Sequence, residues 1–415
     1  MKMVRKREQG QVLILLTAGI ITLLAFTGLA IDMGRLYAEK RAVQGASDTT
    51  SMTGALYLGH YTGVITEEVK TKAINAAIQR AVENGYPAGD VSVTITQVGM
   101  LYDVTTIIQS EIPPTISRIV YKGPLRVRAK RVARVYRVLE FGFGNSLYAL
   151  SPTQKNALEF TGSGTVKLLG GGMYSNSQHA TDSVNFSSSS MTVQTNSVAG
   201  AGGININKPE NVQYPDGTQF DDYNANITPL GQFYVPTPSC AGLPAGTRTK
   251  IGSDVYFTPG VYSKIKETGH DTHHFASGFY CINGEFTTAN GVFEGNGVSF
   301  YVSTDNVSIS GEVSFIASND GSAVDGSGTA WNGMLLHVAT GRLTINGNSD
   351  SYYEGTIYAP SPGNPTCKLN GNSDSDGFNV QIVCDSINVN GDGDLFIEYD
   401  GSNSYVPPIK IDLYE

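Results

Sequence analysis

The feature that most constrains this chain is an uninterrupted apolar run near its start. Val12 to Ile31 are twenty residues without a charge. A helix rises ~1.5 Å per residue, so the run spans roughly 30 Å, the hydrocarbon thickness of a bilayer. Four basic residues precede it: Lys2, Arg5, Lys6 and Arg7. By the positive-inside rule we expect a basic cytoplasmic leader over 1–11 and a single-pass transmembrane helix over 12–31, with the bulk exported to the periplasm or cell surface.

Two processing alternatives stay open beside this anchor. The small residues Gly28-Leu29-Ala30 suit a signal peptidase, but the run is longer than the usual ~7–15-residue signal core. Prepilin-type cleavage after Gly10 is the second alternative. A pilin that resembles the type IV class would carry Glu at the fifth mature residue, where this chain has Leu15. A retained anchor is therefore the preferred interpretation.

Helical spacing continues past the membrane run. Leu29, Met33, Leu36 and Val43 recur at intervals that place them on one helix face. Asp32 is three residues from Arg35, so the two side chains can meet on the helix surface. Gly28 is a small residue that allows close helix–helix contact. The pattern predicts one helix that runs from the membrane into the exported space.

The order of residues around this helix resembles a known family. Gly10 and Gln11 open the segment, and an apolar helix follows. After the helix come Asp32-x-Gly34-Arg35 and then Gln44-x-Ala46-x-Asp48. This resembles the start of the TadE and TadG proteins of Tad/Flp pilus assembly, except that Thr49–Thr53 replaces an Ala-rich stretch. The resemblance implies a membrane-anchored component that packs through its N-terminal helix against other pilus or secretion subunits. The residues expected to carry the family motif and helix packing are Gly10, Gln11, Gly28, Asp32, Gly34, Arg35, Gln44 and Asp48.

Residues 32–140 read as a small exported α+β domain. The stretch 66–84 is an amphipathic helix with an apolar face and a cap at Thr66, and Gly85 and Pro87 end it. Alternating segments then indicate a small antiparallel sheet. This resembles the pilin-like layout of the family.

A basic cluster closes this domain: Arg126, Arg128, Lys130, Arg131, Arg134 and Arg137. Nucleic acid is not an expected partner, because the chain is exported and no stacking aromatic residues accompany the cluster. The two remaining interpretations are a contact with lipid phosphates or an acidic partner, and a solvated basic strand.

Residues 141–415 differ in composition and predict an all-β projecting domain. Residues 139–415 hold 10 Lys+Arg against 27 Asp+Glu, whereas residues 1–138 hold 18 against 10. Asn-Gly pairs recur at Asn346, Asn370 and Asn390. Short strands at this period, with Asn and Gly expected to form left-handed corners, favour a parallel β-helix. A β-sandwich is the alternative. We expect an irregular insertion at about 200–280.

Four cysteines lie in this acidic half: Cys240, Cys281, Cys367 and Cys384. Export permits disulfides, and four cysteines allow three connectivities. Sequence neighbours, Cys240–Cys281 and Cys367–Cys384, are the simplest pairing, and four free thiols are the alternative.

No motif predicts catalysis or a cofactor. The stretch "HDTHH" at 270–274 could hold a metal, but a solvated turn is the preferred interpretation. Asp350, Asp374, Asp392 and Asp394 recur at the expected corners, yet they do not follow the repeat of calcium-binding β-rolls. We expect no enzyme, no cofactor and no metal site.

The preferred function is a membrane-anchored component of Tad/Flp (type IV-like) pilus assembly or secretion. Its expected partners are the lipid bilayer and other pilus or secretion-system subunits. The second candidate is a surface adhesin that binds a surface polymer or host glycan. A carbohydrate-active β-helix enzyme is the third, and no constellation of Arg, Lys and Asp marks a groove for it.

Overall fold

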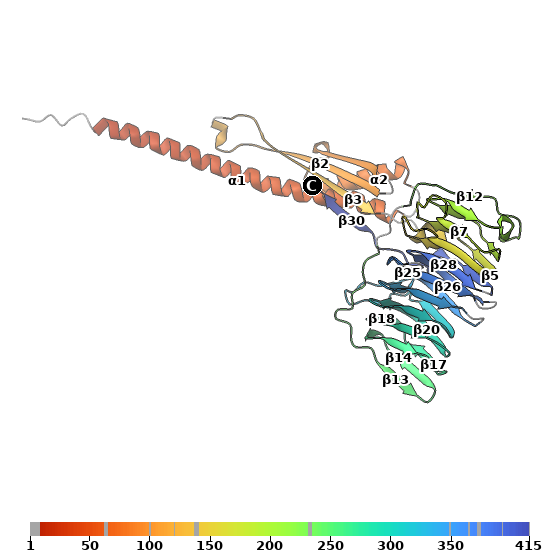
Figure 1. The fold of residues 1–415 in the computed structure, drawn as a ribbon. Helices are drawn as coiled ribbons and strands as arrows, with labels where there is room; N and C mark the ends of the chain where they lie inside the picture. The colour runs from red at the N-terminus through yellow and green to blue at the C-terminus, as the bar shows by residue number, and fades with distance from the viewer. Residues whose placement is uncertain are drawn as a thin grey trace, which may run out of the picture. The chain divides into compact units, whose positions relative to one another are not determined.

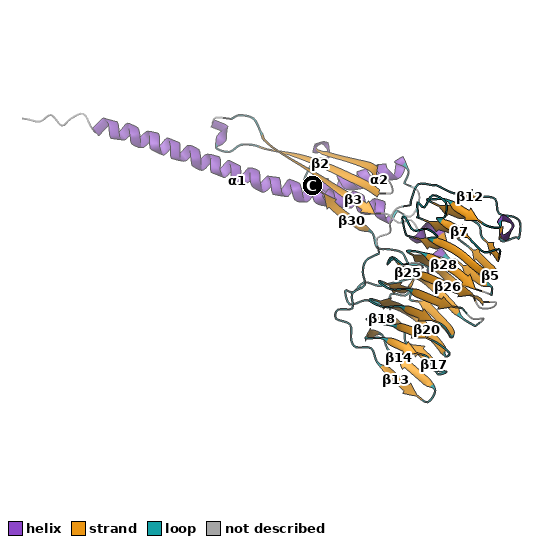
Figure 2. Ribbon diagram, in the orientation of Figure 1, coloured by secondary structure: helices purple, strands orange, loops and turns teal. Residues whose placement is uncertain are grey.

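The computed structural model describes residues 9–61, 65–98, 101–119, 121–136, 141–230, 235–347, 350–363, 366–371, 375–391 and 393–414. The chain divides into two compact units. Unit 1 comprises Met1–Leu139 together with Ile409–Glu415, and unit 2 comprises Glu140–Pro408. Figure 2 shows the two long helices in unit 1 and the many strands of unit 2.

Unit 1 is built on one long helix, α1 (Gln9–His60), of 52 residues. At 1.5 Å per residue it is ~78 Å long. Its first part contains the apolar run, whose large side chains are exposed from Val12 to Ile31. The part after Asp32 packs into unit 1 through buried small and apolar residues such as Val43, Ala55 and Leu58. One helix therefore contains both the apolar run and a segment that packs in the core of unit 1.

A second helix and a sheet complete unit 1. Helix α2 (Glu67–Glu83) begins at Thr66, whose hydroxyl accepts from the Val69 amide, and it buries Val69, Ala73, Ala77 and Ala81. The sheet is antiparallel in the order β1-β2-β3-β30. Its strands are β1 (Val91–Val98), β2 (Leu101–Ile112), β3 (Leu125–Tyr136) and β30 (Lys410–Tyr414). Figure 1 shows the β2–β3 hairpin lying along α1.

The last strand belongs to unit 1, although the sequence analysis assigned all of 141–415 to the projecting part. Lys410 pairs with Tyr136, and Tyr414 pairs with Val132. The physical reason is that β3 has a free edge, and the alternating strand Lys410–Tyr414 satisfies its backbone groups. Unit 2 is thus inserted between two neighbouring strands of the unit 1 sheet.

Unit 2 is a stack of short strands that pair almost entirely in parallel. Each strand pairs with one that lies about one repeat later in the chain, as Leu369 of β26 does with Val389 of β28. The first run of strands is β4 (Asn145–Ala149), β5 (Leu158–Leu169), β6 (Gly172–Ser175), β7 (Val184–Phe186), β8 (Ser190–Gln194), β9 (Val198–Gly200), β10 (Ile204–Ile206), β11 (Val212–Gln213) and β12 (Tyr223–Asn224).

The second run is β13 (Arg248–Ile251), β14 (Asp254–Phe257), β15 (Gly260–Tyr262), β16 (Ile265–Glu267), β17 (Thr272–Phe275), β18 (Gly278–Ile282), β19 (Phe286–Thr288), β20 (Val292–Val302), β21 (Val307–Ile309), β22 (Glu312–Ala317), β23 (Met334–Val338), β24 (Leu343–Asn346), β25 (Tyr352–Ala359), β26 (Cys367–Gly371), β27 (Ser375–Cys384), β28 (Ile387–Gly391) and β29 (Leu395–Glu398). Among the described strands of unit 2, β13 and β14 form an antiparallel hairpin at one end of this run.

The two runs do not follow one another in space. The last strands, β27 and β28, pair with the first strands, β4 and β5. Figure 1 accordingly shows β12 and β13 at opposite ends of the stack, although only residues 225–247 separate them in sequence. Regular strands resume with β13 at residue 248. The irregular segment, residues 225–247, is therefore shorter than the expected insertion at 200–280.

The Asn-Gly repeat has a different role from the one expected. Asn346, Asn370 and Asn390 lie in strands β24, β26 and β28 and pair in direct register. The side-chain amide of Asn370 donates to Asn346 Oδ1 at 2.6 Å, and that of Asn390 donates to Asn370 Oδ1 at 3.5 Å. Their backbones are not left-handed, whereas Asn290 (φ 63°) and Gly311 (φ 99°) are. The expectation of left-handed Asn-Gly corners at these three positions is therefore wrong, because stacked amides satisfy one another along the ladder.

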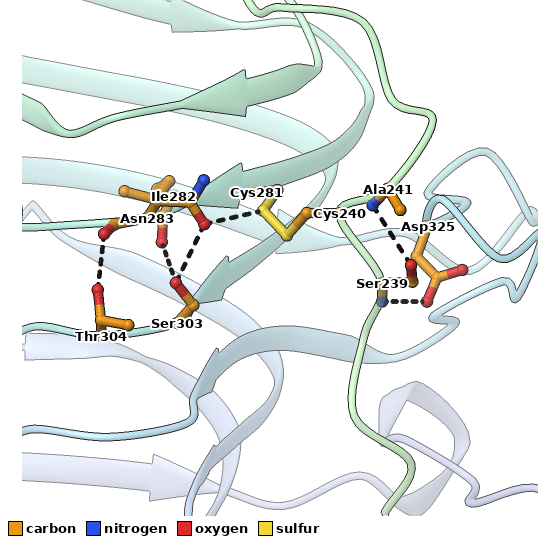
Figure 3. Close-up of a disulfide and its surroundings, with 9 residues drawn as sticks. All are labelled: Ser239, Cys240, Ala241, Cys281, Ile282, Asn283, Ser303, Thr304 and Asp325. Carbon is orange, nitrogen blue, oxygen red and sulfur yellow. Dashed lines mark hydrogen bonds between the residues drawn. A yellow bond between two sulfur atoms is a disulfide. The ribbon is translucent and has the colours of Figure 1, made fainter.

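The interior of unit 2 is apolar and continuous. Phe275, Phe300 and Phe315 are at most 4 % exposed, and their rings meet at 5.0–5.5 Å between centroids. The disulfide Cys367–Cys384 lies in this interior, and Cys240–Cys281 ties the segment 225–247 to strand β18. Figure 3 shows the second of these bonds beside Ser239, whose amide donates to Asp325 Oδ2 at 2.9 Å. Both pairings are those of sequence neighbours that the sequence analysis preferred.

Candidate functional site: a clamp between the long helix and a hairpin

Three residues of the expected helix motif, Gly28, Asp32 and Arg35, contact the turn that joins β2 to β3. Asp32 is only 2 % exposed although it directly follows the apolar run. Its carboxylate accepts hydrogen bonds from the amides of Thr115 (2.9 Å), Ile116 (3.0 Å) and Ser117 (2.7 Å), and from the Ser117 hydroxyl (2.6 Å). We call this set, together with Arg35 and Gly28, the clamp.

Local sequence explains how the turn presents its amides. Pro113 and Pro114 precede Thr115, and proline favours extended or turn backbone while offering no amide hydrogen of its own. Three successive amides then point toward one carboxylate, which is a typical anion-binding arrangement. The Ser117 hydroxyl and amide, followed by the Thr115 amide, stabilise the charged form and hold the pKa of Asp32 well below its usual range, against the opposing effect of burial.

Arg35 reinforces the same turn. Its guanidinium donates to the Thr115 hydroxyl and, at 3.3 Å, to the Pro113 carbonyl. It also lies 3.9 Å from the Asp32 carboxylate, so the Asp32–Arg35 pair predicted from spacing is present. The motif thus uses one acidic side chain to bind the amides of the turn and one basic side chain to bind a carbonyl and a hydroxyl of the same turn.

Gly28 completes the clamp on the side of the apolar run. A Cβ added at Gly28 would lie 2.2 Å from Ile116 Cγ2, so the isoleucine side chain packs directly on the helix backbone. Gly34 has open space at the corresponding position. The close approach available at Gly28 therefore serves a contact within this chain.

Further contacts fasten α1 to the sheet beyond the clamp. Glu39 accepts from the Ser110 hydroxyl at 2.6 Å. Asp48 pairs with Arg131 of β3 at 2.8 Å. Together with the clamp, these contacts tie successive turns of α1 to the β2–β3 hairpin, so helix and sheet form one body.

Three of the six residues of the basic cluster form ion pairs inside unit 1. Arg126 pairs with Glu111 at 2.7 Å, Arg131 with Asp48, and Arg134 with Asp103 at 2.7 Å. Arg128 and Lys130 are exposed, and Arg137 lies outside the described residues. Three of the cations expected to be solvated or to face a partner are thus paired within the domain.

The remaining predicted positions do not join the clamp. Gly34 is exposed and Gln44 is half-buried on α1. The surroundings of Gly10 and Gln11 lie outside the described residues. In unit 2, His273 is buried, and its ring nitrogens each lie 3.2 Å from an acceptor oxygen, one of the Glu267 carboxylate and one of the Val292 carbonyl. His274 lies 3.2 Å from Asp254 and from Glu294.

Within the described residues, no three His, Cys, Asp or Glu side chains gather in a way that could hold an ion. Asp374 and Asp392, two of the expected corner residues, lie outside the described residues. Asp394 accepts from the Thr165 amide at 2.7 Å, so its carboxylate has a structural contact in the stack.

Sequence reasoning missed the hairpin half of the clamp. Thr115, Ile116 and Ser117 are more than 80 residues from Asp32, and nothing local to them marks a partner. The one available signal was the dipeptide Pro113-Pro114 followed by hydroxyl residues, which predicts a turn with free amides.

Comparison with known proteins agrees with the N-terminal motif. Residues 10–55 match the family model for putative Flp pilus-assembly TadE/G-like proteins. The resemblance stated from the motif is therefore confirmed over this segment, which includes Gly28, Asp32 and Arg35. No curated protein and no solved structure matches the chain.

Proposed function

We propose that this chain is a membrane-anchored component of the Flp pilus-assembly machinery, in which α1 spans the bilayer and carries the exported units. The TadE/G-like segment, residues 10–55, supports the link to pilus assembly. The single observation that carries the proposal is the clamp, because it joins the apolar run to the exported sheet with no flexible linker.

Several features support the anchor. α1 is long and apolar enough to cross a membrane. The three threonines within its apolar run each donate to the carbonyl four residues earlier: Thr17 to Leu13, Thr22 to Ala18 and Thr27 to Leu23. Such bonds satisfy hydroxyl groups in a lipid environment, where no water is available. The basic leader favours a cytoplasmic N-terminus, and disulfides in unit 2 suit an oxidising exported compartment.

The clamp would also transmit movement of the helix to the sheet of unit 1. A carboxylate at the membrane boundary is costly unless hydrogen bonds satisfy it, and Asp32 receives four from the hairpin. Any tilt or displacement of the membrane helix would then move the sheet as well. In this proposal the apolar run packs laterally against lipid and other pilus subunits, while the clamp residues keep the exported domain aligned with it.

We further propose that unit 2 is a parallel β-helix. The support is the parallel register of strands one repeat apart, the stacked asparagines and the continuous apolar interior. A β-sandwich would rest on antiparallel pairs. We infer a structural, non-catalytic role for the chain, and glycan binding by unit 2 stays a prediction.

The proposal is tested by co-purification of the full-length protein with Flp pilus components from membranes. Gly28→Leu and Asp32→Leu should each disrupt the clamp and reduce recovery of those components several-fold. Gly45→Leu is the matched control, because it adds the same side chain on the same helix, outside the motif, where space is open. Equal recovery with all three variants would contradict a role for the clamp in assembly.

A further inference from the structure

The turn that closes the β2–β3 hairpin lies beside the membrane segment itself. We define the hairpin tip as residues 113–118 and 121–124. Its Ile116 packs on Gly28, which is three residues inside the apolar run that ends at Ile31. At 1.5 Å per residue, this contact is ~5 Å below the end of the run. The tip therefore reaches the depth at which lipid headgroups meet the hydrocarbon core.

The composition of the tip fits that depth. From Ile112 to Leu125 the chain has no acidic residue, and it carries Arg118 and Lys122, both exposed. Neither forms an ion pair within the described part of the chain, in contrast to Arg126 next to them, which pairs with Glu111. Unpaired cations at a membrane surface attract lipid phosphates.

The tip also carries an aromatic residue suited to an interface. Tyr121 is 51 % exposed, and its hydroxyl donates to the Pro124 carbonyl at 3.4 Å. Tyrosine is enriched at membrane–water interfaces, because its ring is apolar while its hydroxyl remains hydrated. An apolar side chain, an exposed aromatic ring and two unpaired cations thus gather on one short turn at the boundary.

We propose that the hairpin tip is a second membrane contact, in which Tyr121 enters the headgroup region and Arg118 and Lys122 bind lipid phosphates. The occupant is a lipid surface because the tip is continuous with the apolar run through Gly28 and Ile116. This inference rests on the proposed spanning of the membrane by α1. It adds that the exported domain touches the bilayer at two points, which fixes its orientation on the membrane.

The test places fluorescent labels on the full-length, oxidised protein in nanodiscs of phosphatidylcholine and phosphatidylglycerol without other proteins. An environment-sensitive dye is attached at Tyr121→Cys, at Leu24→Cys within the apolar run, and at Lys72→Cys on α2. Lys72 adjoins Ala73, which packs near Gly54, ~33 Å along α1 from Asp32. Lipids that carry a spin label at the headgroup or along the acyl chain then quench dyes at the corresponding depth.

The expected result is at least two-fold quenching of the dye at Tyr121→Cys by headgroup-labelled lipid, and none at Lys72→Cys. Quenching at Leu24→Cys by acyl-labelled lipid reports insertion of α1. Quenching at Leu24→Cys without quenching at Tyr121→Cys would overturn the inference alone and indicate a protein as the occupant of the tip. Loss of quenching at both positions would overturn the membrane-spanning proposal together with it.

A charge reversal separates lipid binding from simple proximity. Lys122→Glu should lower quenching at Tyr121→Cys at least two-fold in nanodiscs that contain phosphatidylglycerol and leave quenching at Leu24→Cys unchanged. Lys130→Glu is the matched control, because Lys130 is also exposed but lies ~17 Å along β3 from Leu125, beyond the ~8 Å screening length. Equal effects of the two reversals would overturn the assignment of the phosphate contact to the tip.

Discussion

The two units of this protein hold together by different means. In unit 1, individual charged side chains, such as Asp32 on the hairpin amides and Asp48 on Arg131, add to an apolar contact between the helix and the sheet. In unit 2, cohesion comes from apolar side chains and amides repeated along the stack, such as the rings around Phe300 and the aligned asparagines. The difference teaches that single residue identities determine unit 1, whereas a repeated pattern determines unit 2.

The largest expected effect tests the apolar interior of unit 2. Phe300 is 1 % exposed and its ring contacts those of Phe275, Phe286 and Phe315. Phe300→Ala should lower the free energy of unfolding by about 3–5 kcal/mol, because it leaves a cavity. Urea unfolding followed by fluorescence of Trp331, the only tryptophan in the chain, reports on unit 2.

Ile251→Ala is the control for that measurement, because Ile251 is 64 % exposed. Its effect should stay within about 0.5 kcal/mol. A similar loss of unfolding free energy in both variants would contradict the comparison, since it would mean that the stability of unit 2 does not depend on the interior of the stack.

The next effect concerns the disulfide Cys240–Cys281, which closes a segment of 41 residues. Replacing both cysteines by serine should cost about 2–4 kcal/mol, because the unfolded chain loses a long crosslink. The same urea titration measures it. Amide exchange at Thr115 to Ser117 should not change, and a simultaneous loss of protection there would show that the two units are not independent.

Acidification should affect the two units over different pH ranges. His337 is buried among aromatic rings, and burial lowers its pKa to about 3. When unit 2 unfolds at a pH below the ordinary histidine pKa of about 6.5, the exposed His337 takes up a proton. The free energy of unfolding of unit 2 therefore falls as the pH decreases from 6.5 toward 3. At about 1.4 kcal/mol per pH unit, this histidine accounts for a loss of roughly 2 kcal/mol at pH 5.

The clamp responds to acid in a lower range. The pKa of Asp32 is lowered in the folded state, so its stabilising effect is present above the unfolded carboxyl pKa and is lost only as pH falls below about 4. Urea titrations of unit 2 at pH 7 and pH 5 should therefore differ, while exchange protection at Thr115 to Ser117, corrected for intrinsic rates, should not. His337→Phe should flatten the dependence for unit 2, and an unchanged slope would argue against this histidine as its source.

Removal of the clamp carboxylate should have a local effect. Asp32→Ala leaves three hairpin amides without their acceptor. Hydrogen exchange at Thr115, Ile116 and Ser117 should rise roughly ten-fold, because an unsatisfied turn opens more often. Asp90→Ala, at an exposed position of the same unit, is the control. Unchanged exchange in Asp32→Ala would mean that the turn is held by packing alone.

The smallest expected effect is at the half-exposed pair Asp48–Arg131. Asp48→Asn should change stability by about 0.5 kcal/mol, because solvent screens such pairs. Exchange of amides in β3 measures the change. A larger effect than that of Asp32→Ala would reverse the order of importance along α1.

Much of this architecture follows from local sequence pattern. The charge-free run predicts the membrane helix, and the motif from Asp32 to Asp48 predicts its continuation. The repeat of Asn370 and Asn390 predicts stacked strands, but the short-range pattern does not reveal that their side chains bond to one another. Local patterns do not predict contacts between residues that are far apart in sequence. The partners of Asp32 and the pairing of Lys410 with β3 are such contacts, and they depend on tertiary packing.

The insertion of unit 2 between β3 and β30 has a mechanical consequence. Both connections leave the sheet at the same end, where Tyr136 pairs with Lys410. A pull on unit 2 therefore acts on β3 and β30 from the same end, and the two strands share the load. Since β3 also pairs with β2 along its whole length, we expect the tension to pass into the body of the sheet and not into the short strand Lys410–Tyr414 alone.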